Sequence, residues 1–279
     1  MVPRSLLVYV DDAASCAVRV RTAAELAAQW SAHLTGVAVA DVMLVPEFVP
    51  TQTFEKQLEL ARQRNAALRE RFEELTRGRE LVTEWRATDT VTAGGTALDV
   101  LAAESRYADL AVVGQPDIRD VHASVPTDLP GQLALLSGRP VLAVPYAWRE
   151  QPVGRRVLVA WDSGRESARA VADAIPLLAS ADAVRVLALT GSGHEAAHGE
   201  QPAADIAVLL ARHGVNVEAS HQSLGDMDVA SALLSAASDY SADLMVMGAY
   251  GRARLREMIL GGTTRSVLGS MTLPVLLSH

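Results

Sequence analysis

The sequence predicts an α/β protein made of two tandem doubly wound parallel five-stranded sheets flanked by helices. The first observation is an internal repeat, because the segment Ala108–Gly114 (Ala-Asp-Leu-Ala-Val-Val-Gly) reappears as Ala242–Gly248 (Ala-Asp-Leu-Met-Val-Met-Gly). The second is register: a Pro-Val-Leu run begins 26 residues after each repeat glycine, at Pro140 and Pro274. The third is the alternation of short apolar runs with longer Ala/Leu-rich stretches, which is typical of βαβ units.

The apolar runs and the stretches with apolar residues three and four apart give the elements of the first half in order. We expect strands near 5–11, 34–40, 81–87, 109–114 and 140–144, and helices near 16–31, 54–77, 94–106 and 128–137. The helix near 54–77 carries charges on several faces. It is either a solvated outer helix or a partner-binding surface.

The second half repeats this order. We expect strands near 155–161, 183–189, 215–221, 243–248 and 274–278, and helices near 165–179, 201–213, 227–239 and 263–270. Right-handed crossovers between successive strands make each sheet parallel. The stretch 145–154 has proline and glycine at its ends and no period, so it is the expected linker. The predicted domains are therefore residues 1–147 and 154–279.

Composition narrows the function classes. Hydrophobic residues make up 49% of the 279 residues and aromatic residues only 4%, so the core must consist of Ala, Val and Leu. The net charge is −8 and the basic residues are scattered, which argues against nucleic acid or a membrane surface as partner. Cys16 is the single cysteine, and no apolar window is long enough to span a membrane. We expect a cytoplasmic protein.

A glycine-rich loop follows the fourth strand of the second half. Gly248, Gly251 and Gly261 lie between a buried strand and the next helix. Ligands bind at this end of the strands in open α/β sheets, and glycine lets backbone N–H groups approach phosphate oxygens closely. The helix adds its unpaired N–H groups, and Thr263 and Thr264 add hydroxyls. The loop therefore predicts an anion or nucleotide-phosphate site.

The chain resembles the universal stress protein family through this pattern: a strand, Gly-x-x-Gly, nine residues, Gly, a helix and Pro-Val-Leu. The resemblance covers both halves and implies an adenine nucleotide alpha hydrolase-like, Rossmann-like fold. It also implies binding of ATP, with Mg²⁺ as a candidate companion ion. By position, the residues implied for the phosphates, the ribose and the adenine are Gly248, Gly251, Gly261, Gly262, Thr263, Thr264, Asp162, Ala160, Trp161 and Leu189. One departure is Gly262, which stands where the family usually has Ser or Thr.

The first half contains a degenerate copy of this loop. Its matching positions hold Gly114, Asp117, Thr127 and Asp128, so only one glycine remains. Two carboxylates would lie where phosphates should, and we expect no ATP binding in the family manner. Its expected role is packing on the second half, dimerisation or recognition of another ligand.

Alternatives remain for the individual motifs. The glycine loop could be a strand-to-helix turn without a ligand, and Asp162 could be a helix cap. His194 and His198 form an H-E-x-x-H pattern, the zinc-peptidase motif, but glycine and proline surround it and no third ligand is evident. A zinc-dependent hydrolase is the remote alternative.

We therefore expect a stress-response protein that binds ATP or a related adenine nucleotide in its second domain and acts as a nucleotide-dependent regulatory or binding module. No Ser/His/Asp or Cys/His constellation is recognisable, so hydrolysis would be slow at most. The alternative is a structural or dimerisation module that binds no nucleotide. Self-association through domain pairing or a homodimer is also expected.

Overall fold

The computed structural model describes residues 2–41, 51–115, 128–190, 203–251 and 262–279. The first half contains β1 (Ser5–Tyr9), α1 (Cys16–Trp30), β2 (His33–Ala40), α2 (Thr51–Thr76), β3 (Thr83–Asp89), α3 (Thr90–Ala93), α4 (Ala97–Ser105), β4 (Leu110–Gly114), α5 (Leu129–Ser137) and β5 (Val141–Val144). The second half contains β6 (Arg156–Trp161), α6 (Arg165–Leu178), β7 (Ala183–Thr190), α7 (Ala204–Arg212), β8 (Val217–Ser223), α8 (Val229–Asp239), β9 (Leu244–Gly248), α9 (Gly262–Ser270) and β10 (Val275–Ser278).

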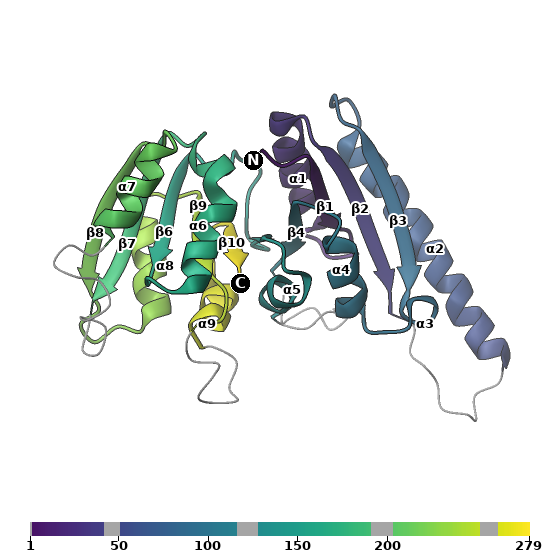
Figure 1. The fold of residues 1–279 in the computed structure, drawn as a ribbon. Helices are drawn as coiled ribbons and strands as arrows, with labels where there is room; N and C mark the ends of the chain where they lie inside the picture. The colour runs from purple at the N-terminus through teal and green to yellow at the C-terminus, as the bar shows by residue number, and fades with distance from the viewer. Residues whose placement is uncertain (1, 42–50, 116–127, 191–202, 252–261) are drawn as a thin grey trace.

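The ten strands found in the described residues form one sheet, in the order β3-β2-β1-β4-β5-β10-β9-β6-β7-β8. Strands pair in parallel within each half, and β5 pairs antiparallel with β10. Leu142 lies opposite Leu276 in that pair. These two leucines occupy matching positions of the repeat, so an approximate twofold axis passes between them. Figure 1 shows the outcome: β3 and β8 lie at opposite ends of the molecule.

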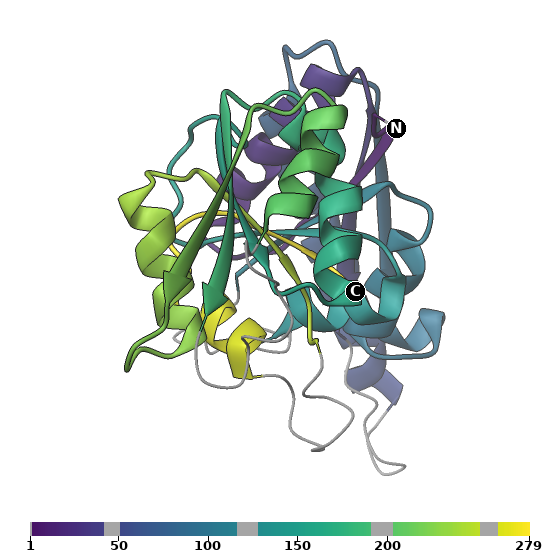
Figure 2. The same cartoon turned by 60° about the vertical axis from the view of Figure 1, so that its left-hand side comes forward.

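Helices cover both faces of the sheet, as a doubly wound fold requires. In the first half α1 contacts α2 and α4 contacts α5, and in the second half α8 contacts α9. Figure 2 shows α6 and α7 on one side of strands β6 to β8 and α8 on the other. At the centre, α5 contacts α9. The core between these layers consists mainly of Ala, Val and Leu, as the composition predicts.

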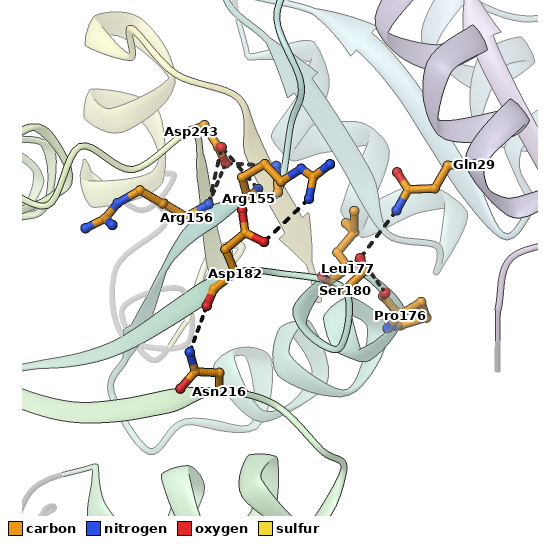
Figure 3. Close-up of polar contacts among 10 residues, drawn as sticks. Gln29, Arg155, Arg156, Pro176, Leu177, Ser180, Asp182, Asn216 and Asp243 are labelled. Carbon is orange, nitrogen blue, oxygen red and sulfur yellow. Dashed lines mark hydrogen bonds and ion pairs between the residues drawn. The ribbon is translucent and has the colours of Figure 1, made fainter.

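The repeated Ala-Asp-Leu motif has a structural role that sequence reasoning missed. The carboxylate of Asp243 accepts hydrogen bonds from the backbone N–H groups of Gly154 (2.8 Å), Arg155 (3.1 Å) and Arg156 (3.2 Å), as Figure 3 shows in part. In the first half, the carboxylate of Asp109 likewise accepts hydrogen bonds from the backbone N–H groups of Arg4 and Ser5, at the start of β1. Burial raises the pKa of Asp243, and these hydrogen bonds act in the opposite direction. Each aspartate thus fixes the first strand of its half against the fourth.

The structure confirms the predicted fold class. It adds that the two five-stranded sheets join at their edges, and that a short helix, α3, follows β3. The helix predicted near 54–77 begins earlier, at Thr51, and buries Leu68 and Phe72. Among the helices of the described residues, none is both long and apolar enough to cross a membrane.

Candidate functional site

The predicted site lies where the order of the strands reverses. The first strand of the second half, β6, has β9 on one side and β7 on the other. After β6 the chain continues from Asp162 through α6 to β7. Strand β9, which pairs with β6 on its other side, ends at Gly248. In open α/β sheets, ligands bind at such a switch point, at the carboxyl ends of the strands. The fold therefore brings Asp162 and the turn Gly248–Gly251 to the edge where a ligand would be expected.

Gly248 is required by packing. A Cβ at this position would lie 2.7 Å from the backbone carbonyl carbon of Glu166 and from the backbone nitrogen of Ser167. These atoms belong to the first turn of α6, which therefore rests directly on the end of β9. Because backbone atoms cannot move aside as a flexible side chain can, only glycine fits here. This reason for Gly248 is independent of any ligand.

Gly251 lies beside two carboxylates. A Cβ built on Gly251 would be 3.7 Å from Oδ2 of Asp162 and 3.7 Å from Oε2 of Glu166. Asp162 is exposed, and its Oδ1 accepts a hydrogen bond from the Gly164 N–H at 2.8 Å. It therefore also holds the entry to α6, which was the alternative interpretation of this residue. Its second oxygen faces Gly251.

Glu166 is a candidate residue that sequence reasoning missed. Its side chain is buried, with Oε1 2.5 Å from Nε of the exposed Arg165. The missed signal is its spacing: Glu166 comes four residues after Asp162, in the first turn of the helix that follows the strand. That spacing places both carboxylates at one side of the glycine turn.

The residues assigned to the nucleoside lie along the same edge. Trp161 ends β6 and pairs in register with Ala188 of β7, and Leu189 follows on that strand. Ala160, Trp161 and Leu189 are each half-buried. A ligand at this edge could therefore contact both strands.

The start of α9 holds the remaining described residues of the predicted loop. Gly262 is exposed at the first position of the helix, and none of the described residues beyond its own helix comes within 4 Å of a Cβ built there. Thr263 is half-buried, whereas Thr264 is buried and its Oγ1 accepts the Tyr250 N–H at 3.1 Å. Thr264 thus ties the glycine turn to α9. Gly261, within 252–261, lies outside the described residues.

The corresponding edge of the first half contains a buried arginine. Arg19 of α1 donates through Nη2 to Oδ1 of Asp11 (2.7 Å) and through Nε to the carbonyl of Tyr9 (2.8 Å). A Cβ on Gly114 would overlap with Nη1 of Arg19. Burial lowers the pKa of Arg19, but the Asp11 carboxylate more than compensates, so the pKa is raised overall. The guanidinium therefore lies in space that a side chain at position 114 would need.

Of the other residues of the degenerate first-half loop, the structure describes Asp128. Asp128 precedes α5 and is buried, and its carboxylate accepts hydrogen bonds from the side chains of Gln132 and Tyr250. Asp117 and Thr127 lie outside the described residues, as do His194 and His198 of the H-E-x-x-H motif. In the described parts of the chain, no group of three or more potential ligand side chains could hold a metal ion.

A cavity of about 550 Å³ lies at the opposite, amino-terminal side of the sheet. It is bounded by α1 and by the chain entering β6, with Glu25 and Arg155 in its lining. In its wall, Nε2 of Gln29 lies 3.4 Å from Oγ of Ser180, a contact between the two halves that Figure 3 shows. This cavity is separate from the predicted site, and the switch-point argument favours the carboxyl edge for ligand binding.

The fold and the position of the turn define a tandem doubly wound α/β protein. The universal stress protein family model matches residues 154–279. This second half therefore belongs to the universal stress protein family. No curated protein matches the sequence.

Solved structures extend the likeness to the whole chain. A universal stress protein from Archaeoglobus fulgidus is 15% identical and has a TM-score of 0.69, with 98% of this chain and 95% of that chain covered. A functionally unknown protein from Pseudomonas aeruginosa is 16% identical and has a TM-score of 0.59, with coverages of 99% and 92%. At these identities the likeness shows the fold. Both halves thus share the fold of a universal stress protein.

Proposed function

We propose that this protein binds ATP or a related adenine nucleotide at the carboxyl edge of its second half and acts as a nucleotide-dependent regulatory or binding module in a cytoplasmic stress response. The observation that carries the proposal is the convergence of Asp162, the turn Gly248–Gly251 and the start of α9 at the switch point. The family match covers the half that carries these residues. We also propose residues 1–147 and 154–279 as its two domains.

Each part of the edge suits a different part of the nucleotide. The exposed amino end of α9, beginning at Gly262, offers backbone N–H groups to phosphate oxygens. Asp162 can accept hydrogen bonds from ribose hydroxyls through the oxygen that faces Gly251. Trp161 and Leu189 offer apolar surface to the base. Mg²⁺, which prefers carboxylate oxygens and water, would find ligands in Asp162 and Glu166, and it would neutralise phosphate charge.

A second candidate function is a structural or dimerisation module that binds no nucleotide. The observation that favours it is packing: the contacts of Gly248 with α6 and of Thr264 with the turn are explained without a ligand. The pairing of β5 with β10 joins the two halves, which supports self-association within one chain. Nucleic acid and membranes are not proposed as partners, because the net charge is −8.

Two experiments separate these functions. Mass spectrometry of the small molecules released from freshly purified protein should find an adenine nucleotide at close to one per chain. Calorimetric titration with ATP, ADP and AMP should then rank the phosphorylation states. An empty protein that also shows no heat of ATP binding would reject the nucleotide function and favour the structural module.

Substitution of Gly251 tests the location of the site. Gly251→Asp places a third carboxylate beside Asp162 and Glu166, and the added repulsion of phosphate should weaken ATP binding at least about tenfold. The matched control is Gly269→Asp, because Gly269 is exposed on α9 and, in the described part of the chain, only its own helix lies within 4 Å of its Cβ position. Equal ATP affinity in the two variants would place the nucleotide elsewhere.

A further inference from the structure

The side chain of Tyr250 crosses from the glycine turn into the first half. Tyr250 lies between Gly248 and Gly251, yet its hydroxyl donates to Oδ2 of Asp128 at 3.1 Å, and only 1% of the residue is exposed. Asp128 also accepts from the side chain of Gln132, one turn further along α5. The hydrogen bond between Tyr250 and Asp128 is thus buried, and its acceptor is held in place. Hydrogen bonds to charged groups are among the stronger ones in proteins.

The first half provides a fitted space for this ring. A Cβ on Gly131 would lie 2.5 Å from the Tyr250 hydroxyl oxygen and 2.8 Å from two of its ring carbons. Gly131 is in α5, where glycine costs about 1 kcal/mol relative to alanine. The missing side chain is therefore what lets α5 and the ring approach each other.

The backbone of the turn depends on such support. Tyr250 has a φ of 54°, in the left-handed region that costs a non-glycine residue about 1–2 kcal/mol. Two hydrogen bonds of the second half fix the same segment: Ala249 N–H to the carbonyl of Ser278 (2.7 Å) and Tyr250 N–H to Oγ1 of Thr264 (3.1 Å). The next residue, Gly251, faces Asp162 and Glu166. One strained turn thus connects the candidate site to the first half.

The first half also sends a side chain from the end of its fourth strand into the other half, but from a different position of the repeat. Gln115 matches Ala249, and its N–H donates to the carbonyl of Val144 as Ala249 donates to Ser278. The side chain of Gln115 also crosses between the halves, and its Nε2 donates to the carbonyl of Leu268 at 2.8 Å. That contact reaches the last part of α9, away from the turn that Tyr250 occupies.

We infer that the first half positions part of the second half's candidate site: Asp128, at the start of α5, holds the Gly248–Gly251 turn through its contact with Tyr250. Tyr250 is a positioning residue, because its side chain is buried against α5 of the first half. The consequence for ATP rests on the proposed function. Since coupling between two sites is reciprocal, nucleotide binding should in turn strengthen the contact between the halves.

The test uses the full chain and three variants. Tyr250→Phe removes the hydroxyl and keeps the ring, Asp128→Asn removes the charge, and the double variant completes a mutant cycle. Asp128 makes no side-chain cap bond to α5, so Asp128→Asn leaves the helix start intact. The control is Gln29→Ala, which removes a polar contact between the halves at the opposite edge of the sheet.

Two readouts are compared. Amide hydrogen exchange at Ala249 and Tyr250, relative to Val246 within β9, reports local opening of the turn apart from global unfolding. We expect about tenfold faster relative exchange in Tyr250→Phe and Asp128→Asn, little further change in the double variant, and none in Gln29→Ala. Calorimetry should show ATP binding about tenfold weaker in the same variants and unchanged in Gln29→Ala.

The outcomes separate this inference from the proposed function. If the parent binds ATP and the Tyr250 and Asp128 variants bind it equally well, the inference is overturned and the function stands. If the parent does not bind ATP, the proposed function fails and exchange alone decides. Faster relative exchange at the turn then supports positioning by the first half, and unchanged exchange overturns it.

Discussion

The two halves have the same order of strands, but different residues lie at the carboxyl ends of these strands. In the first half the guanidinium of Arg19 is buried under Gly114 and binds Asp11. In the second half the backbone of α6 rests on Gly248, and the matching aspartate, Asp162, is exposed. The repeat therefore preserved the scaffold, while among the described residues a buried arginine binds the strand-terminal aspartate in the first half. In the second half the strand-terminal aspartate is exposed, so a ligand can reach it.

The largest effect is predicted for the buried arginine of the first half. Arg19→Met should lower the free energy of unfolding by about 3 kcal/mol, because it leaves Asp11 without its partner in a poorly hydrated place. Urea unfolding followed by circular dichroism measures this difference. The comparison variant in the second half is Arg155→Met, because the side chains of Arg155 and its partner Asp182 are 61% and 68% exposed. It should change stability by less than about 1 kcal/mol. Similar losses in both variants would contradict a buried ion pair between Arg19 and Asp11.

The glycine at the end of β9 should show the next largest effect. Gly248→Ala should cost about 2–3 kcal/mol, since its Cβ would meet backbone atoms of α6 at 2.7 Å. Gly262→Ala, at an open position of α9, should be neutral or stabilising by up to about 1 kcal/mol. Thermal unfolding of both variants provides the comparison. A tolerated Gly248→Ala would mean that α6 can move away from the strand.

The two strand-terminal aspartates give the functional contrast. Asp162→Asn should weaken ATP binding by about tenfold if the carboxylate accepts from the ribose hydroxyls. Asp11→Asn should leave ATP affinity at the parent value, because Asp11 is engaged by Arg19 in the other half. Calorimetry on both variants checks this pair. A loss of affinity in Asp11→Asn alone would reverse the assignment of the two edges.

The smallest effect concerns a helix cap of the second half. Asp228 caps α8 by accepting the Ser231 N–H and hydroxyl, and the hydroxyl contact followed by the backbone contact lowers its pKa. A carboxyl group with a lowered folded-state pKa contributes stability above its unfolded value, and this contribution is lost as the pH falls through the folded value. The stability difference between parent and Asp228→Ala should therefore shrink below about pH 4. A difference that stays constant down to pH 2 would exclude the carboxylate as its source.

Much of the fold could be predicted from the sequence because its signals are local. Buried parallel strands appear as apolar runs, and the Ala-Asp-Leu repeat fixed the register of the fourth strands. The pairing of β5 with β10 could not be predicted, since Leu142 and Leu276 meet only after both halves have folded. The function of Asp243 was missed for a similar reason, because it binds a backbone segment far away in the sequence.

The candidate site could be predicted in position and only partly in detail. Glycines and a strand-terminal aspartate mark the edge, because strand ends carry the ligand site in this class of fold. Arg19 could not be assigned, because a charged residue on a helix is usually solvated, and only the structure places it beside Asp11. Tyr250 was likewise unremarkable in sequence, although its ring is buried against the other half.

Nucleotide stoichiometry tests the contrast between the two edges most directly. Native mass spectrometry of the full chain titrated with ATP should show one nucleotide per chain. That nucleotide should bind Arg19→Met as it binds the parent, whereas half-saturation of Gly251→Asp should need at least about tenfold more ATP. Two nucleotides per chain in the parent, or unchanged binding in Gly251→Asp, would contradict an account in which the second half alone binds a nucleotide.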